Sequence, residues 1–184
     1  KADKASVVTD HIDHFTKTGI QLKSGETLEA DIIVTATGLD LQMAGGIEVT
    51  VDGKPINFHD TITYKAMMFS DVPNFAISFG YTNASWTLRA DLTNEYVCRM
   101  INYMDETGVE IATPRLPEDD VIERRPWVDF SSGYFKRAES KLPAQGHKGV
   151  WQNLQNYPKD IRALKYGEID DGAIAFRKRS ATAP

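Results

Sequence analysis

Two stretches of the sequence place glycine and small polar residues directly after an apolar run, where a ligand could bind. Thr37-Gly38 follows the apolar residues 32–36, and Gly80 follows the apolar residues 75–79. In open α/β sheets, ligands bind beyond the carboxyl ends of the strands. Glycine there lets a ligand approach the backbone closely. The two stretches are therefore candidates for two sides of one binding site.

The second stretch leads into the clearest helix pattern of the chain. Apolar side chains recur there every four residues: Leu88, Leu92, Tyr96, Met100 and Met104. Asn83 or Ser85 can cap its start, and Thr107-Gly108 can end it. The first turn of a helix carries unpaired N–H groups and a partial positive charge, which would stabilise the electron-rich edge of a ligand. Spacing alone, however, favours an ordinary strand-to-helix connection.

Other residues with reactive side chains predict no site. His11 and His14 lie on an expected strand, where residues three apart face opposite sides, and no matching Cys or His pair accompanies them. We therefore predict no metal site. Cys98 falls within the helix pattern and is expected to be a small buried side chain. No serine lies in a G-x-S-x-G motif, so a hydrolase lacks its main signature.

Composition indicates an ordinary globular protein. The chain has 184 residues, of which 41% are hydrophobic and 26% are charged, enough for one domain or one domain with part of another. The net charge of -5 argues against non-specific binding to nucleic acid. A single cysteine favours a reducing, cytoplasmic compartment, and no apolar run is long enough to cross a bilayer. Residues 180–184 read as a polar tail.

The remaining patterns predict an α/β fold. Residues 7–36 read as a β-meander, and its last run, residues 31–37, has the continuous apolar character of a strand buried on both faces. Asp52-Gly53 predicts a hairpin turn, and residues 75–79 predict another apolar strand. One further helix is expected to begin near Leu116, with the polar Glu118-Asp119-Asp120 in its first turn. Two more are expected over about residues 132–142 and 158–165.

An ordered series of segments resembles the flavin-containing and Baeyer–Villiger monooxygenases, and is most similar to the ethionamide-activating type of actinobacteria. The series comprises Ile33-Val34-Thr35-Ala36-Thr37-Gly38, Tyr64-Lys65-Ala66-Met67-Met68, Val72-Pro73-Asn74-Phe75, residues 79–88, Ala90-Asp91-Leu92, residues 129–134, Trp151, Gln155-Asn156-Tyr157 and Asp160. A single Ala-Thr-Gly would be a weak sign, but the series runs in order over most of the chain.

The resemblance implies an FAD enzyme that uses NADPH and dioxygen. In that family the reduced flavin forms a C4a-peroxide, which inserts oxygen into a ketone or oxidises a sulfur or nitrogen centre. The expected fold is then part of an α/β flavoprotein with two dinucleotide-binding domains. Residues 1–38 would end the NADPH-binding domain, residues 39–110 would be the carboxyl-terminal part of the FAD-binding domain, and residues 111–184 would form a helical segment and tail.

The resemblance also implies the site residues. The residues expected to contact the cofactors are Thr37, Gly38, Gly80, Tyr81, Thr82, Asn83, Ser85 and Trp86. The residues expected to line the substrate pocket are Met67, Met68, Asn156 and Tyr157. Gln155-Asn156-Tyr157 would cover the active site. The expected substrate is a small ketone, thioether or thioamide-like molecule.

Several family motifs are absent from the chain. It contains neither G-x-G-x-x-G nor F-x-G-x-x-x-H-x-x-x-W, although the family has the glycine motif once for each dinucleotide. These motifs and the family's catalytic arginine are expected upstream of Lys1, on the rest of the same polypeptide, so no catalytic residue is predicted and the chain alone is expected to bind FAD weakly. Two alternatives remain: a non-catalytic binding domain of the same fold, and an FAD/NADPH oxidoreductase that makes no oxygenated product.

Overall fold

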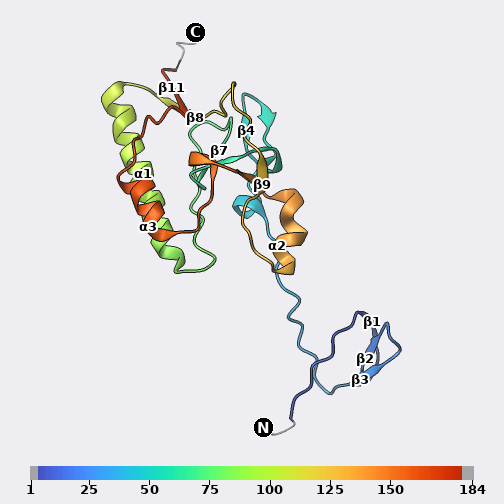
Figure 1. The fold of residues 1–184 in the computed structure, drawn as a ribbon. Coiled ribbons are helices and arrows are strands. Elements are labelled where there is room, and N and C mark those ends of the chain that lie inside the picture. Colours follow the sequence, from blue (N-terminus) through green and yellow to red (C-terminus); the bar gives the residue numbers. More distant parts are fainter. Residues whose placement is uncertain (1–3, 180–184) are drawn as a thin grey trace. The chain divides into compact units, whose positions relative to one another are not determined.

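A computed structural model describes residues 4–179, so the expected polar tail, residues 180–184, lies outside the described part. The chain divides into two compact units, Lys1–Gly38 and Leu39–Pro184. Figure 1 shows the elements of both units along the chain.

The first unit contains a three-stranded antiparallel sheet. Strand β1 (Ile12–Phe15) pairs with β2 (Gly19–Leu22), and β2 pairs with β3 (Thr27–Glu29). A side chain at Gly19 would meet the Leu28 carbonyl oxygen at 1.9 Å, so the close approach of β2 and β3 requires glycine there. The predicted meander is confirmed over these strands.

The predicted buried strand at residues 31–37 is wrong for this structure. These residues form no strand, and Ile32 and Val34 are each 83% exposed. A strand buried on both faces needs neighbours that pair with its backbone and cover its side chains. The described part of the chain places no such neighbour beside this segment.

The second unit begins with short strands and turns. Strands β4 (Thr50–Val51) and β5 (Lys54–Pro55) form the predicted hairpin. Asp52 and Gly53 have φ values of 50° and 75°, the left-handed pair that a type I′ turn requires. The 3₁₀ turns η1 (Met43–Gly46) and η2 (Phe58–Asp60) flank this hairpin.

Strand β6 (Thr63–Tyr64) pairs antiparallel with β7 (Met68–Phe69). The apolar strand predicted at residues 75–79 is reduced to one bridge, between Ala76 and Met68. The turn before it uses Asp71 and Asn74 in left-handed conformations. The prediction of a strand there was therefore wrong.

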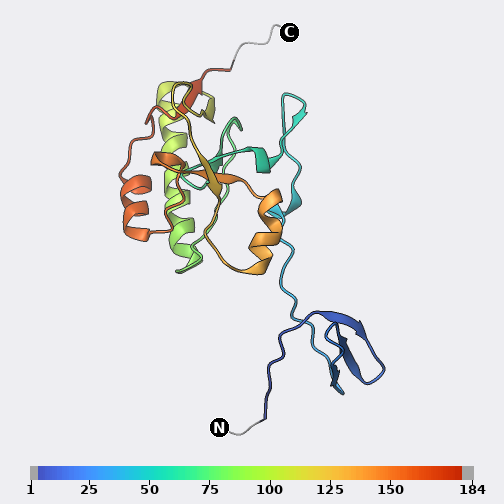
Figure 2. The same ribbon diagram turned by 45° about the vertical axis from the view of Figure 1, so that its right-hand side comes forward.

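Helix α1 (Trp86–Thr107) confirms the predicted long helix. Leu92, Tyr96 and Met100 are buried along one face, as their four-residue spacing requires. Gly108 ends the helix at φ 66°, and its N–H bonds the carbonyls of Asp105 and Met104. In Figures 1 and 2, helix α3 (Tyr157–Asp160) lies beside α1.

The later elements include two more antiparallel pairs. Strand β8 (Ile111–Pro114) pairs with β11 (Ile174–Arg177), and β9 (Arg124–Pro126) pairs with β10 (Ala144–Gly146). Helix α2 (Gly133–Ala138) continues into the turn η3 (Glu139–Lys141), η4 (Gly149–Trp151) precedes α3, and α3 continues into the π turn η5 (Ile161–Lys165). Two predicted short helices are thus confirmed.

The helix expected to begin near Leu116 is not present. Residues 117–121 are exposed, and residues 118–120 form bends, so no packing offsets the cost of starting a helix. The named strands of the described residues pair antiparallel, and one isolated bridge, Ile62 to Ala144, is parallel. The structure is a mixture of helices and strands, consistent with the α/β class.

Two apolar clusters stabilise the second unit, and β7 contributes to both. Met68 packs in the cluster that also buries Leu92 and Tyr96 of α1. Its neighbour Phe69 packs in the other cluster, with Phe58 and Trp127. Successive side chains of a strand point to opposite faces, so this short strand joins the two clusters.

Candidate functional site

The segment between residues 79 and 86 turns tightly around a glycine. The indole of Trp86, the first residue of α1, packs on Gly80, and a Cβ built on Gly80 would lie 2.2 Å from Cδ2 of that ring. Phe79 meets the same indole edge-on, with ring centroids 5.1 Å apart. The local path of the loop therefore requires the absence of a side chain at Gly80.

Tyr81 fixes this loop to the interior through a buried ion pair. Its hydroxyl donates to Oδ2 of Asp160 at 2.7 Å, and Oδ1 of Asp160 lies 2.9 Å from the guanidinium of Arg89. The Arg89 and Asp160 side chains are only 4% and 8% exposed. Arg89 also donates to the carbonyl of Lys65. Burial and the bond to Asp160 raise the pKa of Tyr81, so the hydroxyl stays protonated and acts as a donor.

Gln155 holds the middle of the loop. Its Oε1 accepts the Thr82 N–H at 2.8 Å and the Thr82 hydroxyl at 3.0 Å. Its main-chain oxygen accepts from the Asn83 amide at 3.3 Å. Gln155 was not among the predicted site residues, although its place directly before Asn156-Tyr157 in the matched segment was a usable signal.

The loop ends at the start of α1 without a side-chain cap. Ser85 occupies the N-cap position, but its hydroxyl makes no capping bond and lies 2.9 Å from the Thr87 hydroxyl. The side chain of Asn83 is engaged by Gln155 instead. The first N–H groups of α1 are thus left for another acceptor. Trp86, 51% exposed, stands beside them.

This arrangement can take the electron-rich edge of a flat ligand. N–H groups at a helix start stabilise such an edge without a charged side chain, and the exposed indole of Trp86 offers a flat apolar neighbour. Of the predicted cofactor residues, the structure brings together Gly80, Tyr81, Thr82, Asn83, Ser85 and Trp86. Thr37 and Gly38 are exposed residues of the first unit.

The predicted substrate residues separate into two groups. Tyr157 packs edge-on against Tyr81 with centroids 6.3 Å apart. Asn156 caps α3 by accepting the Lys159 N–H at 3.1 Å. Met67 and Met68 are instead completely buried in the core. Burial under α1 explains this, because the core fills the space around both side chains.

A small apolar cavity opens beside Trp86. It has a volume of about 260 Å³ and is lined by Leu41, Met43, Phe79, Trp86 and Trp127, among others. Ligand pockets usually measure roughly 300–1,000 Å³. The cavity is thus smaller than a typical ligand pocket.

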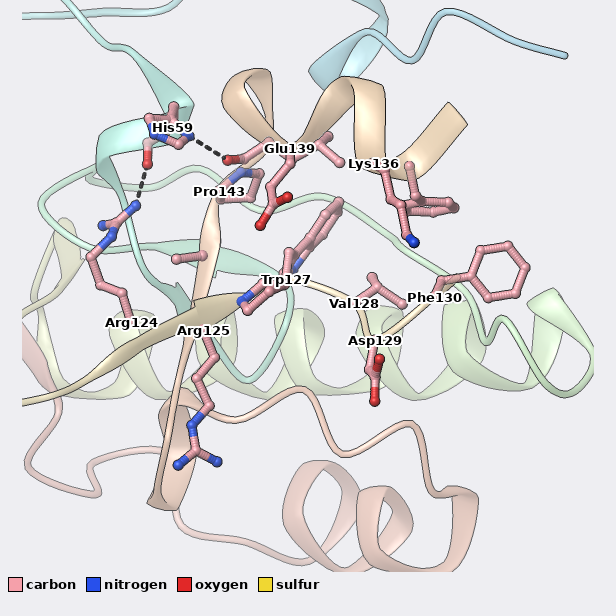
Figure 3. Close-up of a pocket in the computed structure, with 14 residues that line it drawn as sticks. His59, Arg124, Arg125, Trp127, Val128, Asp129, Phe130, Lys136, Glu139 and Pro143 are labelled. Carbon is pink, nitrogen blue, oxygen red and sulfur yellow. Dashed lines mark hydrogen bonds between the residues drawn. The ribbon is translucent and has the colours of Figure 1, made fainter. Parts of the chain in front are cut away.

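A larger cavity of about 370 Å³ lies between β9 and α2 (Figure 3). None of the predicted site residues lines it. Two of its polar side chains already bind main chain: His59 Nδ1 bonds the Leu142 carbonyl at 3.2 Å, and Arg124 donates to the carbonyl of His59. In Figure 3, the side chain of Arg125 extends away from α2. The indole N–H of Trp127 is buried and has no hydrogen-bond partner among the described residues, so it is not exposed to a molecule in the cavity.

Three further features bear on the candidates from the sequence. Among residues 4–179, no group of three or more His, Cys, Asp or Glu side chains is placed to hold a metal ion. Cys98 is exposed on α1, so the expectation that it is buried was wrong, because it falls outside the buried stripe. No helix of the described residues is both long and apolar enough to cross a membrane.

Comparison with known proteins gives strong matches to flavin enzymes. The chain is 49% identical over 181 residues to the FAD-containing monooxygenase EthA of Mycolicibacterium smegmatis, which covers 98% of this chain and 37% of that protein. It is 51% identical over 178 residues to EthA of Mycobacterium tuberculosis, covering 97% of this chain and 36% of the relative. It is 44% identical over 182 residues to the probable FAD-binding monooxygenase AlmA of Acinetobacter baylyi, covering 99% and 36%.

No protein-family model and no solved structure matches the chain. The chain spans little more than a third of the length of these relatives. Its resemblance to the flavin-containing monooxygenases is therefore confirmed over nearly its whole length, and it corresponds to about 36% of an FAD-containing monooxygenase such as EthA.

Proposed function

We propose that the chain forms part of the cofactor site of an FAD- and NADPH-dependent monooxygenase. The complete enzyme would transfer one oxygen atom from O₂ into a ketone, as in a Baeyer–Villiger reaction, or onto a sulfur or nitrogen centre. The observation that carries the proposal is the loop of residues 80–85, fixed at Tyr81 and Thr82 and followed by an uncapped helix start. The names and identity of the relatives support the flavin.

In this proposal the chain binds and orients the flavin. The N–H groups at the start of α1 would donate hydrogen bonds to the electron-rich edge of the ring, and Trp86 would pack beside it. Gly80 would leave room for the Trp86 indole to pack against the loop. Bound FAD supplies the redox chemistry, with NADPH as reductant and dioxygen as oxidant.

The two units would have different partners in the complete enzyme. Residues 1–38 would end the NADPH-binding domain, so that Thr37 and Gly38 lie near the cofactors, and residues 39–110 would complete the FAD-binding domain. Asn156 and Tyr157, beside Tyr81, would lie over the substrate. A small ketone, thioether or thioamide-like molecule is the proposed substrate, and the single cysteine favours a cytoplasmic location.

The full-length protein tests the proposal. We expect it to purify with a flavin absorption spectrum and to oxidise NADPH when oxygen is present. A colourless protein that takes up no added FAD would overturn the proposal and favour a non-catalytic binding domain.

Product analysis tests the oxygenation step. The full-length enzyme would be supplied with NADPH, ¹⁸O₂ and either a cyclic ketone or an aryl thioether. We expect one ¹⁸O atom in the ester or sulfoxide. Flavin-dependent NADPH oxidation with no labelled product from either substrate would favour an oxidoreductase without oxygenation.

A further inference from the structure

Gln155 has a backbone conformation that side-chain-bearing residues rarely adopt. Its φ is 47°, in the left-handed region that favours glycine. A residue keeps such a conformation when its surroundings over-determine it, and these positions cluster at functional sites. The contacts of Gln155 show what determines its conformation.

Gln155 bonds to a loop more than 70 residues earlier in the chain. The side-chain oxygen accepts two bonds from Thr82, and the main-chain oxygen accepts one from Asn83. The side-chain nitrogen donates to Oδ1 of Asn153 at 3.1 Å, which fixes which end of the amide faces Thr82. The left-handed turn at Gln155 allows its side chain and its own carbonyl to face the loop together.

These bonds determine what the start of α1 presents. Asn83 could cap the helix, but its side chain is drawn to the carbonyl of Gln155. The Thr82 N–H likewise donates to the side chain of Gln155. The first-turn N–H groups of α1 remain uncapped by a side chain as a result.

We propose that Gln155 is a positioning residue, which holds residues 82–83 so that the first turn of α1 stays open to the flavin. This inference rests on the proposed function. Gln155 acts through Thr82 and Asn83 and needs no contact with the cofactor.

Asn74 provides a matched control. It is also an amide residue with a left-handed backbone, at φ 51°. Its side chain also ties a distant segment, donating to the Glu110 carbonyl at 2.9 Å and accepting the Ala112 N–H at 2.8 Å. Neither segment belongs to the loop of residues 80–85. Asn74→Ala therefore removes a similar latch without touching the proposed site.

The first experiment measures FAD binding by full-length protein. Gln155→Ala is expected to weaken FAD affinity about tenfold, since two bonds to Thr82 are lost, and to shift the flavin absorption maximum. Asn74→Ala is expected to leave affinity within about twofold, although both variants lose two or more bonds. Gln155→Glu keeps an acceptor for Thr82 and should recover most of the affinity. Equal losses in Gln155→Ala and Asn74→Ala would show that Gln155 is merely structural.

The second experiment needs no flavin. Hydrogen exchange of the Thr82 amide is measured in the flavin-free 184-residue chain. We expect exchange to be about tenfold or more faster in Gln155→Ala and unchanged in Asn74→Ala. Unchanged exchange in Gln155→Ala would overturn the inference. Absence of flavin binding in the wild-type full-length protein would instead overturn the proposed function, whatever the exchange rates.

Discussion

The indole of Trp86 lies against the α-carbon of Gly80, so close that a Cβ on Gly80 would come within 2.2 Å of the ring. The two residues stand at opposite ends of the loop that precedes α1. The ring of Phe79 also packs on the Trp86 indole, and the two ring centroids lie 5.1 Å apart. The loop is therefore closed by a glycine–indole contact, and its polar groups face Gln155 and Asp160.

Gly80→Ala is expected to destabilise the second unit by about 1–3 kcal/mol, because the added methyl group overlaps the indole. The matching double variant, Gly80→Ala with Trp86→Ala, removes the overlap. Urea unfolding of the four proteins in this cycle should give a coupling energy of about 1 kcal/mol or more. Strictly additive effects would show that the contact does not determine the loop.

Asp160→Asn tests the ion pair beneath the loop. The change leaves the guanidinium of Arg89 buried with no charge partner, and breaking a buried pair costs about 3–5 kcal/mol. Glu95→Gln is the control, since Glu95 pairs with Lys165 at 3.3 Å on the surface and exposed pairs contribute about 0–1 kcal/mol. The free energies of unfolding, measured in urea at neutral pH, should differ accordingly. A loss below about 1 kcal/mol in Asp160→Asn would contradict the assigned role of the pair.

Two buried tyrosines should lower the free energy of unfolding in alkaline solution. Burial raises the pKa values of Tyr64 and Tyr96, and the nearby Asp171 raises them further. The hydroxyls bond to one another at 2.7 Å. Above about pH 10 the unfolded chain releases both protons and the folded chain keeps them. The stabilising contribution is thus present below pH 10 and is lost as pH rises above it.

Lys65, beside these tyrosines, has the opposite effect at lower pH. Burial lowers its pKa, although its ion pair with Asp171 at 2.9 Å opposes the shift. Between the lowered pKa of the folded chain and pH 10.5, the unfolded chain binds more protons at Lys65 than the folded chain does. The contribution of Lys65 to the free energy of unfolding therefore rises with pH up to pH 10.5. Urea unfolding between pH 8 and 11.5 should show a maximum near pH 10, then a fall. Tyr96→Phe should reduce the fall by up to about 1.4 kcal/mol per pH unit, and an unchanged slope would contradict the assignment.

Sequence patterns predicted the elements whose signals are local. Helix α1 followed from its apolar spacing and Gly108, and the hairpin followed from Asp52-Gly53. The loop at Gly80 was also found, because glycine after an apolar run marks a close approach. In each case the residues that determine the conformation lie within the element itself.

Predictions failed where the outcome depends on distant neighbours. Residues 75–79 have strand-like side chains, but their backbone pairs with β7 at one point only. Met67 and Met68 lie in the core with residues of α1, and that contact depends on residues distant in the sequence. The proposed role of Gln155 depends on a contact with residues 82–83; the matched segment placed Gln155 near the active site but did not predict this contact.

Val34 tests how the surroundings of residues 31–37 determine their conformation. In the 184-residue chain Val34 is 83% exposed, so Val34→Thr should change the free energy of unfolding by less than about 0.5 kcal/mol. Val72→Thr makes the same change at a position that is 1% exposed. Val72→Thr should lower the free energy of unfolding by about 1–3 kcal/mol, because it buries a hydroxyl group without a hydrogen-bond partner.

The same pair should behave differently in the full-length protein. If the rest of the polypeptide covers residues 31–37 with neighbouring strands, Val34→Thr should there cost about 1–3 kcal/mol, like Val72→Thr. Thermal unfolding of both variants, in the 184-residue chain and in the full-length protein, gives the comparison. A Val34→Thr variant that remains neutral in full-length protein would show that this apolar run is not a buried strand there either. The boundary between the two proposed cofactor-binding domains would then have to lie elsewhere in the chain.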